Sequence, residues 1–426
     1  MPTVDTTIYG VIAREILDSR GNPTIEAVVI LNSGYRGKVS VPSGASVGKY
    51  EAVELRDGDT ARYNGLGVKK AVENINMIIS PKIRGMNAAK QSDIDHKLIE
   101  LDGTPNKAKL GANATLAVSL GCAVAVAEAM RLQPYQYIHT LFTPLFPGVT
   151  LSRIPTPMFN VINGGKHGGG NLNFQEYHVI PATNMSFSEG LQIGVETYHE
   201  MKKVLANRNA VTAVGDEGGY TPNLFTNQDA LDILLETIRG EPYQYAVQIF
   251  CGLDVAASEF KTEHGYQIKD RPAVYPTHEF IAYLVEMAHK YQLLLLEDPL
   301  DQDDWDGWIE LTKQLGQEVV IIGDDLIATN KERLQKAIDK KACNAIIIKP
   351  NQIGTLTETL EVAALAKKNT IQIVMSHRSG ETTDSVIADL GVAVQAEYVK
   401  FGAPARGERI AKYNRLLEIE SLLKLQ

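Results

Sequence analysis

The sequence predicts an α/β protein, with a C-terminal barrel of the (β/α)₈ type preceded by a smaller α+β domain. Up to about residue 135, strand-like segments come first and helical segments follow. Farther along, apolar strands alternate with helical segments to the C-terminus, which implies a parallel sheet with helices outside it. Charged residues follow several of these strands, and such residues converge on one mouth when a sheet closes into a barrel.

Residues 1–135 carry the pattern of the α+β domain. Residues 8–32 alternate as strands do, around the turn-like sequence DSRGNP at 18–23. We expect residues 35–56 to continue as a strand, with a Gly/Ser-rich loop, SGASVG, at 43–48. Helical periodicity runs from about 66 to 131, and the small residues at 110–130 favour close helix packing.

The most apolar stretch of the chain runs from Leu116 to Ala127. It is about 12 residues long, whereas a membrane-spanning helix needs ~20. We therefore interpret it as a buried helix and expect no membrane segment.

A proline-rich segment at 136–157 is the expected linker to a barrel domain at 158–426, because its prolines disfavour a long helix. Within that domain the sequence predicts helices over residues 227–239, 276–290, 331–341 and 355–368. One strand, one helix and two short loops take about 25 residues, which is the approximate spacing of Asp324, Lys349, His377 and Lys400. This arrangement favours a closed barrel over an open sheet.

Composition excludes several classes of protein. The chain has 426 residues, a net charge of −9 and no basic stripe, so we expect no nucleic-acid partner. Its three cysteines, Cys122, Cys251 and Cys343, are too scattered for a disulfide framework or a zinc site. The N-terminus has neither a basic region nor an apolar core, so we predict no signal peptide and expect a cytoplasmic protein.

Three carboxylates, Asp254, Glu297 and Asp324, stand at the ends of apolar runs. Mg²⁺ prefers oxygen ligands, and carboxylates without clustered His or Cys fit Mg²⁺ or Mn²⁺ better than Zn²⁺. Taken singly, each carboxylate could instead be the N-cap of the following helix. Three carboxylates at equivalent positions favour a site for a hard divalent metal.

Lys349 and Lys400 end two further apolar strands. Burial and a nearby cation lower the pKa of a lysine, which lets it act as a base; a lysine that reaches to the rim is the structural alternative. The loop SHRSGET at 376–382 offers a guanidinium fork at Arg378 and a hydroxyl at Ser379, and these groups suit a phosphate. Together these residues indicate an enzyme that acts on an anionic substrate.

Two glycine-rich segments carry further ionisable groups. They are NGGKHGGG at 163–170, which contains His167, and GDEGG at 215–219, which contains Glu217. Such segments can serve as lids, and flexible surface turns are the alternative. Glu217 and Glu176 could form a carboxylate pair for acid chemistry, because like charges held close together raise the pKa of one of them.

Long, ordered motifs resemble the enolase family over nearly the whole chain. They are ILDSRGNPT at 16–24, VPSGAS at 41–46, ELRDGD at 54–59, DGTPNK at 102–107, GDEGG at 215–219, DVAASEF at 254–260, NQIGTLTE at 351–358, SHRSGET at 376–382 and GAPAR at 402–406. The resemblance implies a barrel with the atypical order ββαα(βα)₆ and a homodimer, or a higher oligomer built from it. A second location of the protein, at the cell surface, stays open as an alternative.

The resemblance also implies an activity, the reversible dehydration of 2-phosphoglycerate to phosphoenolpyruvate in glycolysis and gluconeogenesis. This family uses two Mg²⁺ ions per active site, with Mn²⁺ as a substitute, and a lysine base. Lys349 is then the base that removes the α-proton, and Lys400 stabilises the enediolate that forms. Glu217, paired with Glu176, assists departure of the hydroxyl.

The remaining roles are likewise implied by the resemblance. The ligands of the first metal are Asp254, Glu297 and Asp324, and Ser46 is the ligand of the second. Arg378 and Ser379 bind the phosphate. The other residues of the pocket are His167, His377 and Gln175, and the loops 43–48 and 163–171 close over the substrate.

The sequence departs from the family pattern beside two of these residues. Val47, next to Ser46, and Phe401, next to Lys400, stand where the family usually has Thr. Phe401 could displace a hydrogen-bonding hydroxyl or pack behind its strand. Two alternatives to an active enolase stay open: a dehydratase or racemase acting on another carboxylate, and a weakly active or non-catalytic binding protein on an enolase scaffold.

Overall fold

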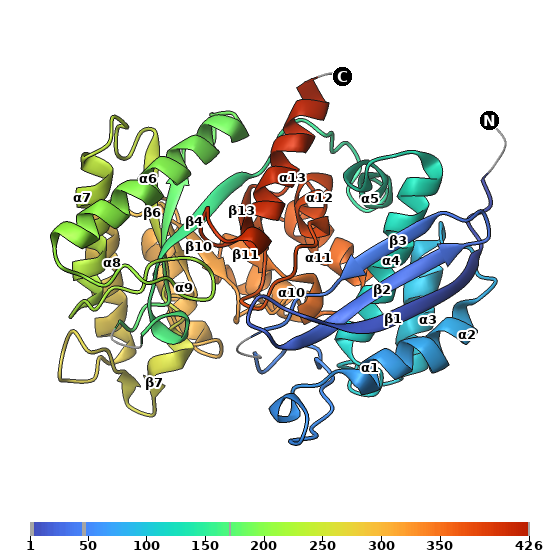
Figure 1. Cartoon of the computed structure of the whole chain (residues 1–426). Coiled ribbons are helices and arrows are strands. Elements are labelled where there is room, and N and C mark those ends of the chain that lie inside the picture. Colours follow the sequence, from blue (N-terminus) through green and yellow to red (C-terminus); the bar gives the residue numbers. More distant parts are fainter. Residues whose placement is uncertain (1–3, 45–47, 170–171, 425–426) are drawn as a thin grey trace.

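The computed structural model describes residues 4–44, 48–169 and 172–424 (Figure 1). The chain begins with an antiparallel sheet in the order β1-β2-β3, formed by β1 (Ile8–Leu17), β2 (Pro23–Leu31) and β3 (Arg36–Ser40). Short helical segments follow, η1 (Tyr63–Gly65), α1 (Lys69–Glu73), η2 (Asn74–Ile79) and α2 (Ser80–Ile83), and then α3 (Gln91–Asp102), α4 (Ala112–Met130) and α5 (Pro134–Phe142). Strands precede helices in this part, as the sequence predicts.

Helix α4 packs directly on the N-terminal sheet, behind it in Figure 1. A Cβ atom at Gly37 of β3 would lie 2.0 Å from the carbonyl oxygen of Gly121 in α4. Only glycine therefore allows the helix and the strand to approach this closely. The small residues at 110–130 serve this close packing, as predicted.

The length argument for α4 was wrong, although its burial is confirmed. The helix has 19 residues and, among the described residues, is the one helix long and apolar enough to cross a membrane by length and composition. Within the most apolar stretch of this helix, 83% of the residues are buried inside the protein. Because its side chains are already covered by the sheet and neighbouring helices, α4 is a core helix of this domain.

The predicted strand over residues 35–56 is too long, because β3 ends at Ser40. Pro42 has no backbone N–H for a ladder bond. Farther along, the backbone bonds to other loops instead of to a strand: the N–H of Ala52 donates to the Gln352 carbonyl at 2.8 Å, and that of Val53 donates to the Asn106 carbonyl at 2.8 Å. This segment runs between the sheet and the barrel mouth.

Eight strands close into the barrel, in the order β10-β11-β12-β13-β4-β5-β6-β9. They are β4 (Thr156–Asn163), β5 (Glu176–Pro181), β6 (Ile249–Asp254), β9 (Leu295–Glu297), β10 (Val320–Gly323), β11 (Ala345–Ile348), β12 (Gln372–Ser376) and β13 (Tyr398–Lys400). The β4–β5 and β5–β6 pairs are antiparallel, and the other pairs are parallel. The predicted barrel and its ββαα(βα)₆ order are confirmed.

The barrel helices follow the same order along the chain. They are α6 (Phe187–Asn207), α7 (Asn227–Arg239), α8 (Thr277–Tyr291), α9 (Trp305–Leu315), α10 (Lys331–Lys340), α11 (Leu356–Lys368), α12 (Val386–Ala393) and α13 (Gly407–Lys424), with η4 (Ala257–Phe260) and a small hairpin of β7 (Lys261–Thr262) and β8 (Gly265–Tyr266) before α8. The four predicted helices correspond to α7, α8, α10 and α11. The first part of the expected linker is helical, because α5 extends to Phe142.

Apolar side chains fill the barrel below its mouth. They form one buried cluster of Met158, Ile180, Leu295, Ile322, Ala345, Ile347, Val374 and Tyr398. This packed layer closes the floor of the barrel, so polar chemistry is confined to the end where the parallel strands finish.

Candidate active site

The strand ends place the predicted polar residues at one mouth of the barrel. Asp254, Glu297 and Lys400 are the last residues of β6, β9 and β13. Asp324, Lys349 and His377 directly follow β10, β11 and β12. Glu176 is the first residue of β5, and because β5 is antiparallel to its neighbours, its start lies at this same end.

Lys400 lies among three buried carboxylates. Its Nζ is 2.9 Å from Glu176 Oε2, 3.1 Å from Asp254 Oδ2 and 2.8 Å from Glu297 Oε1. Burial alone would lower the pKa of Lys400, but these carboxylates raise it well above its usual value. Lys400 is therefore a fixed positive charge at the centre of the mouth.

Lys349 forms an ion pair with Asp324, on the neighbouring strand. Burial would lower the pKa of Lys349, but the Asp324 carboxylate outweighs burial and raises it. The expectation of a lowered lysine pKa is wrong, because the carboxylate oxygens that could bind a metal cation bind the lysine ammonium groups.

The mouth holds more buried negative charge than its lysines balance. Burial, aided by neighbouring carboxylates, raises the pKa of Asp254 and raises that of Glu297 well above its usual value. Burial likewise raises the pKa of Asp298 well above its usual value and that of Asp325 to about 7. A hard divalent cation would relieve this excess, so the donor set of Asp254, Glu297 and Asp324 fits Mg²⁺.

The described residues also include two close groups of metal-ligating side chains. One is Asp298, Asp324 and Asp325, which the sequence prediction included only through Asp324. The main-chain N–H groups of Asp324 and Asp325 donate to the Asp298 carboxylate at 2.9 and 2.8 Å. Asp298 therefore fixes the turn that presents Asp324 to the mouth.

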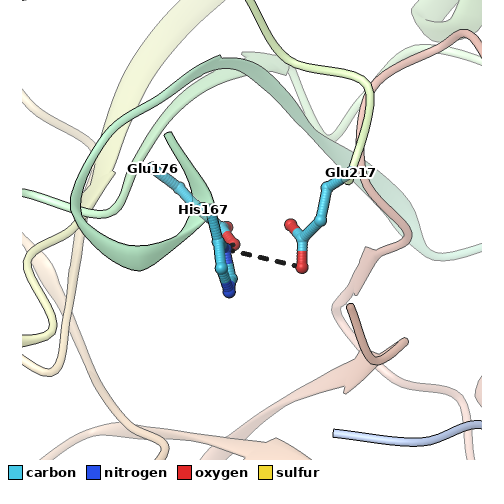
Figure 2. A group of neighbouring side chains, drawn as sticks. All are labelled: His167, Glu176 and Glu217. Atoms are coloured by element: carbon cyan, nitrogen blue, oxygen red, sulfur yellow. Dashed lines mark hydrogen bonds and ion pairs between the residues drawn. The ribbon is translucent and has the colours of Figure 1, made fainter. Parts of the chain in front are cut away.

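The second group contains His167, Glu176 and Glu217 (Figure 2). His167 Nδ1 lies 3.1 Å from Glu176 Oε1 and 3.6 Å from Glu217 Oε1. Figure 2 shows that Glu217 reaches this ring from a different segment of the chain. The three predicted residues thus form one contact group.

The expectation that one carboxylate of this pair has a raised pKa is wrong. Burial would raise the pKa of Glu176, but Lys400, His167 and His178 lower it well below its usual value. Burial and Glu176 would raise the pKa of Glu217, but His167 and His377 lower it to about 2. The pKa of His167 is raised, because Glu217 and Glu176 outweigh its burial, so the imidazole is the preferred place for a proton.

His377 lies near Glu217 Oε2, whereas His167 lies near Glu217 Oε1. It is held by Arg409, a residue that the sequence did not predict for the site. Its Nε2 is 3.5 Å from Glu217 Oε2, and Arg409 donates to its Nδ1 at 2.7 Å. Burial lowers the pKa of His377, and a donor at Nδ1 requires a neutral ring. Arg409 lies in α13, and its role at the site follows only from the packing of that helix on the loop at 376–382.

The predicted phosphate loop is tied to the N-terminal domain. Ser43 and Gly380 exchange main-chain hydrogen bonds of 2.7 and 2.9 Å. The Arg378 guanidinium is buried and donates to the Glu51 carboxylate at 2.8 Å and to the Asn351 side chain at 3.1 Å. Ser379 is buried beside it, and its carbonyl accepts from Arg409 at 2.6 Å. Glu51 was not predicted, and its carboxylate shows that Arg378 already binds an anion here.

Gln175 and Phe401 each have a contact that explains their position. Gln175 donates to Asp254 Oδ2 at 3.3 Å. Phe401 is fully buried and faces Tyr413 of α13, with 5.9 Å between the ring centroids. Successive residues of an extended chain face opposite ways, so Lys400 faces the mouth while Phe401 packs behind the strand.

Ser46, the predicted ligand of a second metal, and its neighbour Val47 lie outside the described residues.

These residues line one cleft of about 570 Å³, counting the solvent space at its opening. Of the predicted residues, those that line it are His167, Gln175, Glu176, Glu217, Asp254, Asp324, Lys349, His377, Arg378, Ser379 and Lys400. Glu297 is fully buried beneath it. The cleft can hold a small anion between lysines, a guanidinium and a carboxylate–imidazole group.

Comparison with known families agrees with this arrangement. The model of the enolase N-terminal domain matches residues 8–138, and that of the enolase C-terminal TIM barrel domain matches residues 151–425. Together the two domains account for nearly the whole chain, in the order in which the structure shows the sheet and the barrel. The chain therefore belongs to the enolase family.

Proposed function

We propose that this protein catalyses the reversible, Mg²⁺-dependent dehydration of 2-phosphoglycerate to phosphoenolpyruvate. The supporting observation is the position of Lys349 relative to Glu176. Their strands, β11 and β5, are four positions apart in the order of the eight-stranded barrel, so the two groups face each other across the mouth. A base and an acid group on opposite sides of one substrate suit an elimination from opposite faces.

Lys349 is the proposed base. In its neutral form it accepts the proton from C2 of 2-phosphoglycerate, and the electron pair left behind spreads onto the carboxylate as an enediolate. Lys400 places a fixed positive charge near that carboxylate. Asp254, Glu297 and Asp324 would hold the first Mg²⁺, which would supply further positive charge at the substrate carboxylate and would compete with the two lysine ammonium groups for these oxygens.

The opposite side of the mouth assists the second half of the reaction. The C3–O bond breaks as the double bond forms, and the leaving hydroxyl takes a proton from the group of Glu217, Glu176 and His167, so water departs. His167 supplies this group with its proton, because its pKa is raised between two ionised carboxylates. Arg378 holds the phosphate, in place of Glu51, and keeps C2 and C3 between the two sides.

The other parts of the proposal concern the setting of the enzyme. We propose Ser46 as the protein ligand of a second Mg²⁺, a homodimer as the basic assembly, and the cytoplasm as the compartment. The three cysteines are buried free thiols, which fits a reducing environment. Phe401 packs behind its strand, which removes one ground for expecting a weakly active binding protein.

The test is ultraviolet detection of phosphoenolpyruvate formed from 2-phosphoglycerate, with Mg²⁺ and with excess chelator. We expect turnover that requires Mg²⁺ and that falls about 10³-fold or more in Lys349→Ala, because a lost general base typically costs 10²–10⁴-fold. Lys340→Ala, on the exposed end of α10, is the matched control and retains activity. A folded wild type that gives no phosphoenolpyruvate in Mg²⁺ would rule out the proposal.

A further inference from the structure

Two residues one layer below the mouth hold the carboxylates of Glu217 and Glu176. Asn160 of β4 and His178 of β5 face each other in register across the antiparallel pair of strands. Asn160 Nδ2 donates to Glu217 Oε2 at 3.0 Å, and His178 Nε2 donates to Glu176 Oε2 at 2.8 Å. Both side chains are fully buried, so each acts on the cleft only through the carboxylate it holds.

The proton of His178 must lie on Nε2. An ionised carboxylate only accepts hydrogen bonds, so the bond to Glu176 requires an N–H at that nitrogen. The other nitrogen, Nδ1, is buried and has no hydrogen-bond partner within the described part of the chain. His178 therefore acts on the cleft through one ring nitrogen, Nε2, whose N–H is directed at Glu176.

The two donors select the same oxygen of each carboxylate. Glu176 Oε2 accepts from His178 and contacts Lys400, while its Oε1 faces His167. Glu217 Oε2 accepts from Asn160 and lies near His377, while its Oε1 faces His167. Both Oε1 atoms therefore point at one imidazole because both Oε2 atoms are held from elsewhere.

We propose that Asn160 and His178 are a pair of positioning residues that fix the Oε2 atoms of Glu217 and Glu176 and so direct both Oε1 atoms to His167. The inference rests on the proposed function, since the group they position is the one that would protonate the leaving hydroxyl. Loss of either donor lets its carboxylate rotate, and a misplaced acid group lowers the rate of C–O cleavage more than it lowers substrate binding. Removal of the C2 proton by Lys349, across the barrel, is left intact.

The test compares two amides at position 178. In His178→Gln the longer side chain brings an N–H to the place of Nε2, whereas in His178→Asn the amide is too short to reach Glu176. We expect kcat for phosphoenolpyruvate formation to fall about 10- to 100-fold in His178→Asn, the scale of a lost hydrogen bond to a charged group, with KM changed less than about threefold. His178→Gln recovers most of that loss, and Asn160→Ala falls as His178→Asn does. Equal kcat in both position-178 variants, whether high or low, would overturn the proposal.

A second measurement separates positioning from general damage. In D₂O, we expect His178→Asn and Asn160→Ala to keep the wild-type rate of deuterium incorporation at C2 of 2-phosphoglycerate, although phosphoenolpyruvate forms slowly. Loss of both reactions together would contradict the proposed role. Ile180→Val, at the next inward position of β5, is the packing control and leaves both rates unchanged. Wild type inactive in both reactions would mean failure of the proposed function, whereas an active wild type with an unaffected His178→Asn would mean failure of this inference alone.

Discussion

At the scale of single residues, the environment decides which form of each ionisable group is present. Lys400 and Glu297 are both buried, and burial disfavours the charged form of either side chain. Three carboxylates surround Lys400 and keep it charged. Glu297 shares that one ammonium group with the carboxylates of Glu176 and Asp254, and burial raises the pKa of Glu297. The sequence could identify these residue types at the strand ends, but their pKa values depend on which neighbours share a partner.

Phe401 gives a prediction at this scale. Replacing it with Thr, the residue usual in the family, removes a fully buried ring that faces Tyr413. We expect the free energy of unfolding to fall by roughly 3 kcal/mol, as for other large-to-small changes of aromatic core residues, and kcat to stay within about twofold of wild type. Urea unfolding and steady-state kinetics measure the two effects. A higher kcat in Phe401→Thr would contradict the packing interpretation and favour a missing hydroxyl beside Lys400.

At the scale of elements, the sequence predicted the period of each segment better than its end. Helix α7 has the predicted bounds because Thr226 caps its start and Arg239 ends its amphipathic pattern. Strand β3 stops far short of its predicted end, because residues beyond Ser40 bond to loops that are distant in sequence. Local pattern carries no information about such partners, so the segment that reaches the barrel mouth, and Glu51 within it, could not be placed.

The close contact between α4 and β3 can be tested with Gly37→Ala, which adds a single methyl group to β3. The added Cβ of Gly37→Ala would lie 2.0 Å from the Gly121 carbonyl oxygen, so the helix or the strand must shift. We expect a loss of about 2–3 kcal/mol in the free energy of unfolding, in the range of overpacked cores. Gly407→Ala, where an added Cβ meets nothing within 4 Å, is the control and keeps wild-type stability. Denaturant unfolding that shows equal stability for the two variants would contradict this account.

The same helix links the N-terminal domain to the barrel mouth. Thr115 of α4 donates to the carbonyl of Gly354 at 2.8 Å, just beyond η5 (Pro350–Gln352). That short helix directly follows Lys349. A displaced α4 would therefore move the loop that carries the proposed base, and kcat of Gly37→Ala should fall together with its stability.

At the scale of the whole molecule, barrel closure brings the site together. The sequence could predict that charged residues stand at strand ends, because spacing and period are local properties. It could not show that Lys349 and Glu176 face each other, since this follows from the strand order β10-β11-β12-β13-β4-β5-β6-β9. Nor could it show that His178 and Asn160 lie opposite each other, because that requires the register of the antiparallel pair β4–β5.

Barrel closure also concentrates negative charge, and this yields the last prediction. Protons compete with Mg²⁺ for Asp254 and Glu297, because burial raises the pKa of each carboxylate. As the pH rises, these carboxylates lose their protons, so Mg²⁺ binds more tightly and stabilises the fold more. We expect saturating Mg²⁺ to raise the melting temperature more at about pH 8 than at about pH 6, with a gain of about 2.7 kcal/mol at 100 times the Kd. Asp254→Asn should lose most of this gain at both pH values, whereas Asp339→Asn, a change on α10 outside the cleft, should keep it. A melting temperature that does not respond to Mg²⁺ in wild type would mean that the buried carboxylates are balanced by the lysines alone.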